Sequence, residues 1–218
     1  MPFHALISDL DGTLLDTLQD LADSVNAALA HLGLPTHELD SYRGFVGEGR
    51  RIMALRSLPV ERRDEATIAQ MLARFTEEYD KRWIQHSRPY QGVAEMLDGA
   101  VAQGIRLAVL SNKPQGYTES MVSRLLSDWT FEYVLGDSPR FPRKPDPSGA
   151  NYIVQGMNLK PEECIYIGDS GIDMQTATAA GLHGVGVLWG FRGADELRSN
   201  GARLLVRHPS EILHLLSR

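Results

Sequence analysis

Apolar residues follow two patterns along the chain, and each pattern predicts one kind of element. Short runs of consecutive apolar residues are typical of strands that are buried on both faces. They predict strands at 5–7, 105–110, 131–135, 164–167 and 185–188. Apolar residues spaced by three or four predict amphipathic helices. These helices are expected at 18–32, 68–83, 93–101, 117–125, 152–157 and 172–180, with a shorter helical piece that ends near Pro59.

The order of these elements predicts the fold class. Residues 16–85 carry only helical patterns, whereas strands and helices alternate after Pro89. Short apolar strands that alternate with helices indicate a parallel sheet covered by helices on both faces. We therefore expect an α/β protein with a doubly wound parallel sheet. Its core comprises residues 1–15 and 86–218, and a helical segment, residues 16–85, is inserted after the first strand.

Composition and charge exclude several classes of protein. The chain has 218 residues, with 22 Lys and Arg against 28 Asp and Glu, and the net charge of −6 argues against binding to nucleic acid. No apolar run approaches the roughly 18 residues that cross a bilayer, so no membrane association is expected. The single cysteine, Cys164, cannot form an internal disulfide, which favours the reducing cytoplasm.

Polar and charged residues follow four of the predicted strands. Doubly wound sheets bind ligands at the carboxyl ends of their strands, so we expect these four segments to converge on one crevice. The segments are 9–13, 111–113, 143–146 and 168–173.

Four aspartates in these segments predict a metal site. Asp9 and Asp11 are two residues apart, so in an extended chain they point to the same side. Asp169 and Asp173 are four residues apart at a helix start and share a helical face. Clustered carboxylates either raise one another's pKa values or recruit a cation, and an all-oxygen set suits Mg²⁺. The sequence therefore predicts that Asp9, Asp11, Asp169 and Asp173 bind Mg²⁺.

The same segments offer groups that suit a phosphate. Lys144 and the hydroxyl and amide donors of Ser111 and Asn112 match an anion with several acceptor oxygens. One carboxylate beside a metal-bound phosphoryl group can attack phosphorus in line. A second carboxylate can protonate the leaving oxygen and then activate water. The prediction is a phosphatase that acts on a small phosphorylated metabolite through an aspartyl-phosphate.

Four motifs together resemble those of the haloacid dehalogenase superfamily, in the order that family shows, and they cover nearly the whole chain. The resemblance implies a Rossmann-like core with a helical cap, Asp9 as nucleophile and Asp11 as general acid and base, with Ser111 and Lys144 on the phosphate. It also implies Mg²⁺ held by Asp9, the main-chain carbonyl of Asp11 and Asp169, with Asp173 beside it. The motifs are Asp9–Thr17, Ser111-Asn112-Lys113, Lys144-Pro145-Asp146-Pro147 and Gly168-Asp169-Ser170 with Asp173.

Within the superfamily, the helical segment resembles the cap of phosphoglycolate phosphatases. That cap carries Val-Gly-x-Gly followed by Arg-x-Leu, and this chain has Val46-Gly47-Glu48-Gly49 followed by Arg56-Ser57-Leu58. Glu48 stands where a small polar residue is commoner in that family. Glycine lets the backbone approach a ligand closely, and Arg56 offers a positive charge to an anionic substrate, so we expect Gly47, Gly49 and Arg56 to contact the substrate.

Two alternative functions share part of this chemistry. A phosphomutase of the same superfamily needs the same four motifs and differs in its cap. A phospho-accepting receiver domain of a signalling protein also gathers carboxylates, a hydroxyl and a lysine around Mg²⁺, but it needs neither an acid at Asp11 nor a 70-residue helical insert. A monomer and a homodimer are both compatible with the sequence.

Overall fold

The computed structural model describes residues 2–217 and divides the chain into two compact units. The core unit comprises the residues up to Leu15 and those from Pro89 onward, and the helical unit is Asp16–Arg88. The sequence placed the second boundary at residue 85, three residues before the end of the helical unit.

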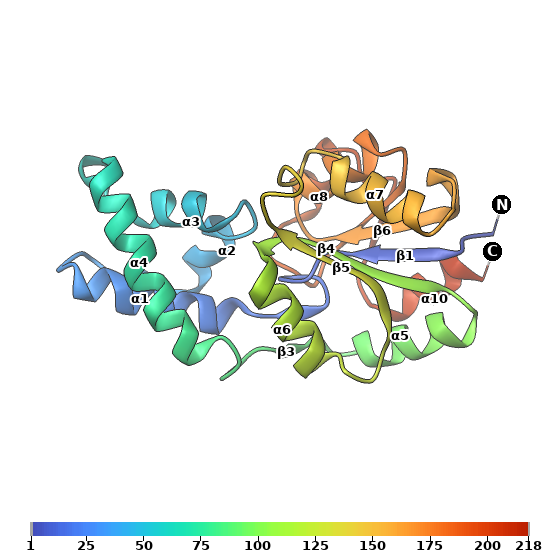
Figure 1. Cartoon of the computed structure of the whole chain (residues 1–218), viewed down its shortest axis with the longest axis horizontal. Helices are drawn as coiled ribbons and strands as arrows, with labels where there is room; N and C mark the ends of the chain where they lie inside the picture. The colour runs from blue at the N-terminus through green and yellow to red at the C-terminus, as the bar shows by residue number, and fades with distance from the viewer. Residues whose placement is uncertain (1, 218) are drawn as a thin grey trace. The chain divides into compact units, whose positions relative to one another are not determined.

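A six-stranded, fully parallel sheet forms the centre of the core unit, with the strand order β5-β4-β1-β6-β7-β8 (Figure 1). All five strands expected from the apolar runs are present, so the predicted α/β fold is confirmed. The short strand β8 was not expected. The bounds are β1 Ala5–Ser8, β4 Arg106–Pro114, β5 Phe131–Asp137, β6 Cys164–Gly168, β7 His183–Val187 and β8 Leu204–Val206.

Helices cover both faces of this sheet. Figure 1 shows α7 and α8 on one face, and α5, α6 and α10 on the other. Alternate strand residues such as Ile7, Ala108 and Tyr166 point to one face and pack in a buried cluster with Ile153 of α7 and Ala177 of α8. The bounds are α5 Val93–Ala102, α6 Gln115–Leu125, α7 Ser148–Gly156, α8 Gly171–Ala179, α9 Ala194–Ser199 and α10 Ser210–Leu216.

The helical unit is built on two long helices that pack against each other, α1 (Leu18–His31) and α4 (Glu65–Arg82). Four residues of the expected apolar stripe, Ile68, Met71, Phe75 and Tyr79, are each at most 5% exposed, whereas Leu72 and Trp83 are half-buried. Two shorter helices lie between them in sequence, α2 (Tyr42–Phe45) and α3 (Arg50–Ser57). No helix within residues 2–217 is both long enough and apolar enough to cross a membrane.

The chain enters and leaves the helical unit through two short strands that pair with each other, β2 (Leu15–Asp16) and β3 (Arg88–Pro89). The buried carboxylate of Asp20 on α1 holds the returning segment. It accepts hydrogen bonds from the main-chain N–H groups of His86 and Ser87 and from the Ser87 hydroxyl, at 2.7–3.1 Å. The two ends of the insertion are therefore fixed beside each other.

Candidate active site

The first expected site residue follows the central strand of the core sheet. Strand β1 pairs with β4 on one side and β6 on the other, and it ends at Ser8. Asp9 comes next, and its N–H donates to Ile167 O of β6 at 3.0 Å. Because both neighbouring strands run parallel to β1, the segments that follow all three strands lie at the same edge of the sheet.

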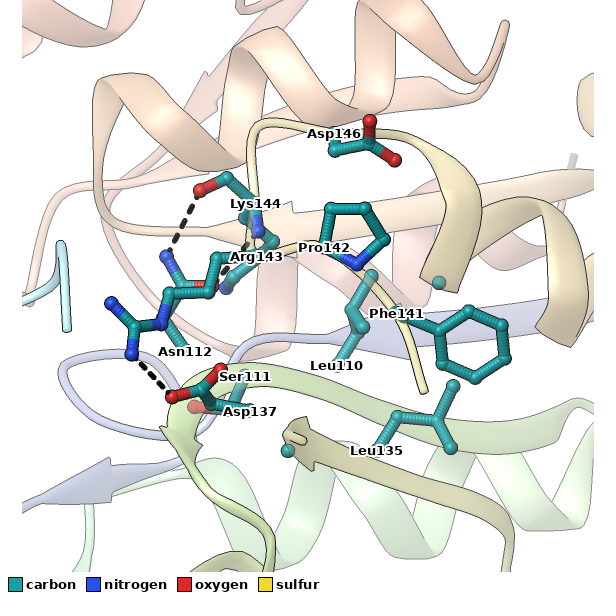
Figure 2. A pocket seen from close by; sticks show the side chains of 12 residues that line it. Leu110, Ser111, Asn112, Leu135, Asp137, Phe141, Pro142, Arg143, Lys144 and Asp146 are labelled. Atoms are coloured by element: carbon teal, nitrogen blue, oxygen red, sulfur yellow. Dashed lines mark hydrogen bonds and ion pairs between the residues drawn. The ribbon is translucent and has the colours of Figure 1, made fainter. Parts of the chain in front are cut away.

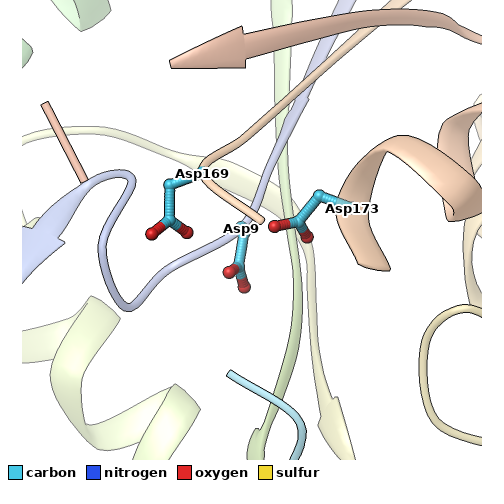
Figure 3. A group of neighbouring side chains, drawn as sticks. All are labelled: Asp9, Asp169 and Asp173. Carbon is cyan, nitrogen blue, oxygen red and sulfur yellow. The ribbon is translucent and has the colours of Figure 1, made fainter. Parts of the chain in front are cut away.

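Three of the expected aspartates meet at this edge. Asp9, Asp169 and Asp173 each offer a carboxylate oxygen, and these atoms lie within 4.8 Å of one another. Figure 3 shows the three side chains around one common space. All three residues are buried, with exposed fractions of 6%, 2% and 0%. We call this group the carboxylate cluster.

Burial and mutual repulsion change the proton affinity of the cluster. Burial raises the pKa of Asp9 to about 7; Asp173 adds to the rise and Lys144 opposes it. Burial also raises the pKa of Asp169 well above its usual range, and the neighbouring carboxylates of Asp173 and Asp9 raise it further. Ionisation of these carboxyl groups is therefore unfavourable unless a cation neutralises their charge. Metal sites in proteins have this electrostatic property.

Lys144 supplies one cation to the cluster. Its Nζ lies 2.8 Å from Asp9 Oδ1 and 2.7 Å from Asp173 Oδ1, and its side chain is 3% exposed. Burial alone would lower the pKa of Lys144, but the charges of Asp173 and Asp9 outweigh burial and hold that pKa well above its usual value. Lys144 is therefore charged, and it orients the Asp9 carboxylate.

Asp173 anchors this lysine. Its Oδ1 faces Lys144 Nζ and lies 3.2 Å from the hydroxyl of Tyr166, while its Oδ2 accepts from the N–H and hydroxyl of Ser170 at the start of α8. Both oxygens of Asp173 thus have partners from the protein. Its shortest contact with another charged group is the one of 2.7 Å with Lys144 Nζ.

Asp169 is held differently, by a loop that follows β7. Its Oδ2 accepts from Phe191 N at 2.7 Å, and its Oδ1 lies 3.4 Å from the Thr13 hydroxyl. A Cβ atom at Gly190 would lie 2.3 Å from Asp169 Cβ and 2.3 Å from Gly12 O, which is closer than real Cβ contacts. Glycine at position 190 therefore lets the loop approach the cluster.

The position of the Asp11 side chain differs from the one expected from the sequence. The structure brings together three carboxylates rather than four, because the Asp11 side chain pairs with Lys113, whose Nζ lies 3.0 and 3.1 Å from its two oxygens. The expectation assumed an extended chain from Asp9 to Asp11. Strand β1 ends at Ser8, however, and the chain then turns, with Gly12 at φ +84°. The Asp11 side chain therefore lies outside the carboxylate cluster, and Asp11 as a metal ligand stays a prediction.

The two expected phosphate donors on β4 lie beside Lys144. Strand β4 extends to Pro114, so Ser111 and Asn112 belong to the strand itself. The Asn112 side chain accepts from Lys144 N at 2.9 Å and donates to Lys144 O at 3.2 Å. It therefore positions the lysine segment, and its contact with a phosphate stays a prediction. The Ser111 hydroxyl accepts from Lys113 N at 3.3 Å, and its own proton remains available to an anion.

A pocket opens beside these residues. Its lining includes Ser111, Asn112 and Lys144 together with apolar side chains such as Leu110 and Phe141 (Figure 2). An ion pair of 2.8 Å joins Arg143 and Asp137, which also line it.

The substrate residues expected in the helical unit lie in one loop and the helix after it. Gly47 and Gly49 have φ values of +105° and +87°, which favour glycine. The Arg56 guanidinium contacts Glu48 Oε1 at 2.5 Å and donates to Gly44 O at 3.1 Å. Arg56 of α3 therefore has partners in the segment that precedes this helix, and its contact with substrate stays a prediction.

Comparison with known proteins identifies the family. The model of the haloacid dehalogenase-like hydrolases matches residues 6–187, which include the carboxylate cluster and Lys144. The chain belongs to this family of hydrolases. The resemblance inferred from the four motifs is thereby confirmed.

Relatives of this hydrolase are phosphatases. It is 34% identical over 195 residues to the phosphoglycolate phosphatase of Thiobacillus denitrificans, covering 88% of this chain and 86% of that protein. It is 31% identical over 220 residues to the phosphoglycolate phosphatase of Colwellia psychrerythraea, covering 99% and 97%. The expected class of enzyme, a phosphoric monoester hydrolase, is confirmed.

Solved structures show the same fold over the whole chain. A candidate phosphoglycolate phosphatase from Lactobacillus delbrueckii has a TM-score of 0.93 at 27% identity, with 99% of both chains covered. A candidate β-phosphoglucomutase from Thermotoga maritima has a TM-score of 0.76 at 25% identity, also over 99% of both chains. Since hydrolases and a candidate mutase share this fold, the fold alone does not distinguish the two reactions.

Two residues of the hydrolase were not expected at the site. Lys113 belongs to one of the four motifs but was given no role, although a lysine directly after Ser111-Asn112 was a signal. Tyr166 was assigned to a buried strand because the residues around it are apolar, and no role was given to its hydroxyl, which lies 3.2 Å from Lys144 Nζ. Their contacts with Asp11 and Lys144 place them among the groups that orient the site.

Proposed function

We propose that this hydrolase cleaves small phosphate monoesters by transferring the phosphoryl group to Asp9, with phosphoglycolate as the first candidate substrate. The observation that carries the proposal is the contact of 2.8 Å between Lys144 Nζ and Asp9 Oδ1 within the buried carboxylate cluster. A carboxylate that is oriented by a fixed cation is prepared for in-line attack on phosphorus.

The residues fit a Mg²⁺ ion. Three buried carboxylates within 4.8 Å form an all-oxygen donor set, and burial raises the pKa of Asp9 and of Asp169, so a divalent cation would relieve unfavourable negative charge. Asp9 and Asp169 would hold the ion, with Asp173 beside them and the main-chain carbonyl of Asp11 as the resemblance implies. When bound, Mg²⁺ supplies neutralising charge to the phosphoryl oxygens.

The protein's own side chains supply the nucleophile, the general acid and base, and the groups that bind the phosphoryl oxygens. Asp9 forms a bond to phosphorus while the bond from phosphorus to the leaving oxygen breaks. A proton on the Asp11 carboxyl moves to that oxygen, so the product leaves as an alcohol. In the second step, Asp11 takes a proton from water as the water oxygen attacks phosphorus and the bond to Asp9 breaks. Lys144 and the Ser111 hydroxyl bind phosphoryl oxygens throughout.

The proposed substrate rests on the relatives. Proteins that are 31% and 34% identical over most of this chain are named phosphoglycolate phosphatases. Gly47, Gly49 and Arg56 belong to the helical unit, and their role in substrate choice stays part of this proposal.

The sequence also favours a reducing compartment, in line with the buried thiol of Cys164, whose pKa burial raises to about 11.

A phosphate-release assay tests the proposal. Purified enzyme is incubated with phosphoglycolate, other small phosphate esters and p-nitrophenyl phosphate, in Mg²⁺ and in EDTA. We expect release of inorganic phosphate from phosphoglycolate in Mg²⁺ and none in EDTA. Asp128→Asn serves as a matched control for aspartate variants, because Asp128 is exposed in the core unit. No release from any ester would refute the proposal.

The alternatives predict different products. A phosphomutase would convert a sugar phosphate into its isomer with little free phosphate, and chromatography of the products separates the two outcomes. A receiver domain would take phosphate from a kinase partner. Family membership over residues 6–187 and the presence of the helical unit argue against the receiver domain, and the relatives named phosphoglycolate phosphatases favour the hydrolase over the mutase.

A further inference from the structure

Lys113 is a buried lysine at the last position but one of strand β4, which is an unusual place for this residue. Lysines are almost never buried unless they are paired. The Lys113 side chain is 3% exposed, and its Nζ lies 3.0 and 3.1 Å from the two oxygens of Asp11. One ammonium thus contacts both oxygens of the carboxylate to which the proposed function gives the proton transfers.

The two buried lysines of the site have separate partners. Lys144 contacts Asp9 and Asp173, whereas Lys113 contacts Asp11, which lies outside the carboxylate cluster. We infer that Lys113 is a positioning residue that holds the Asp11 carboxyl group in the orientation required for proton transfer. This inference rests on the proposed function, because it acts only through the acid and base role of Asp11.

The backbone around Lys113 is fixed well enough for this task. Its N–H donates to the Ser111 hydroxyl at 3.3 Å, and its carbonyl accepts from the Thr118 hydroxyl of α6 at 3.1 Å. A Cβ atom at Gly136 on the neighbouring strand β5 would lie 2.6 Å from the Lys113 carbonyl oxygen, so the strands approach closely here. Both main-chain polar groups of Lys113 therefore have side-chain partners, which hold the backbone from which the ammonium extends.

Asp11 needs such a partner more than Asp9 does. It follows the end of β1 and precedes Gly12 at φ +84°, so it lies on a turn, and its side chain is 17% exposed. Proton transfer requires donor and acceptor within about 2.6–3.2 Å of each other, and a displacement of about 1 Å can cost about 100-fold in rate. A carboxylate held through both oxygens has lost the side-chain rotation that would cause this loss.

Lys113 takes part in neither proton transfer. The proton given to the leaving oxygen comes from Asp11, and the proton taken from water returns to Asp11, so the cycle balances without a proton from the lysine. Removing the ammonium should therefore change the rate only where the Asp11 proton matters.

A double-mutant cycle tests this inference. The four enzymes are wild type, Lys113→Met, Asp11→Asn and the double variant, each assayed on phosphoglycolate and on p-nitrophenyl phosphate, whose leaving group needs less protonation. We expect Lys113→Met to lower kcat on phosphoglycolate by about 10- to 100-fold and the first step on the aryl ester by much less. In the Asp11→Asn background, Lys113→Met should not lower the rate on either substrate any further.

Two further variants control for charge and for folding. Lys160→Met removes an exposed lysine from the same unit and should leave kcat unchanged. Lys113→Arg keeps a cation and should recover part of the lost kcat. Mg²⁺-dependent thermal shifts of each variant verify that the carboxylate cluster is intact, because Lys113 is not one of its members.

The outcomes separate the two proposals. If Lys113→Met slows the first step equally for both esters and slows it again in the Asp11→Asn background, the lysine acts on substrate or on folding, and the inference is overturned. If it mainly raises KM, Lys113 binds substrate, and the inference is overturned as well. If Asp11→Asn itself retains full activity on phosphoglycolate, the proposed mechanism fails instead.

Discussion

Protons and Mg²⁺ should compete for the carboxylate cluster, and the strength of this competition follows from the Asp9 carboxyl group. Burial, aided by Asp173, raises the pKa of Asp9 to about 7 in the metal-free protein. The ion binds the carboxylate, so a proton must leave before the ion can bind. Lowering the pH from 8 to 5.5 should therefore weaken Mg²⁺ binding.

The magnitude follows from the ionised fraction of one group. With a pKa near 7, roughly nine-tenths of the Asp9 carboxyl is ionised at pH 8 and about 3% at pH 5.5. The Mg²⁺ affinity should therefore fall about 30-fold, or about 2 kcal/mol. The Asp169 carboxyl, whose pKa burial also raises, makes this value a lower limit.

The raised pKa of Asp9 also determines how the stability of the folded protein changes with pH. The folded, metal-free protein binds the Asp9 proton more tightly than the unfolded chain does, because the folded pKa is the higher one. The metal-free protein thus gains stability from this group at low pH and loses that gain as the pH rises from about 4 to about 7. Mg²⁺ should raise the melting temperature more at pH 8 than at pH 5.5.

Calorimetric titration with Mg²⁺ provides the assay. Two buffers with different ionisation enthalpies, neither of them phosphate, report the protons released, and about one should leave near pH 6. Asp9→Asn should make the pH dependence shallower, whereas Asp128→Asn should keep the wild-type profile. An affinity that is equal within twofold at both pH values, with no proton release, would refute the reasoning.

Three further predictions concern single residues. Asp9→Asn should lower kcat by several orders of magnitude with circular dichroism unchanged, because an amide is a poor nucleophile; retention of a tenth of wild-type turnover contradicts the role of Asp9. Asp11→Asn should lose roughly 10²- to 10⁴-fold on alkyl phosphates and much less in the first step on aryl phosphates, and equal losses would show that Asp11 is not the acid. Gly190→Ala places a methyl group 2.3 Å from Asp169 Cβ, so calorimetry should detect weaker Mg²⁺ binding, and an unchanged affinity would mean that the loop relaxes freely.

The sequence predicted the position of those site residues that come directly after a strand or in the loop that follows it. Asp9, Asp169 and Lys144 come after apolar runs, and parallel strands bring such residues to one edge of a sheet. The same reasoning placed Asp173 correctly, because the start of a helix has a regular geometry. The sheet and its main helices were predictable for the same reason, since burial on both faces leaves unbroken apolar runs.

The remaining parts depend on contacts between residues far apart in sequence. The Asp11 side chain was misplaced because alternation holds only in extended chain, and its partner Lys113 is 102 residues away. The Asn112 amide binds the main chain of Lys144, 32 residues away. Tyr166 resembled core because its ring is buried, although its hydroxyl faces Lys144 and Asp173. No local pattern encodes these pairings.

The paired strands β2 and β3 make the helical unit an exchangeable module. Its 73 residues, Asp16–Arg88, leave and rejoin the core at adjacent positions, and the Asp20 carboxylate ties the returning chain from within the inserted segment. The core therefore requires only that any insertion begin and end at neighbouring points. Evolution can replace the whole segment without disturbing strand β1, which Asp9 follows, and an engineer can graft a relative's segment at Leu15 and Pro89 on the same principle.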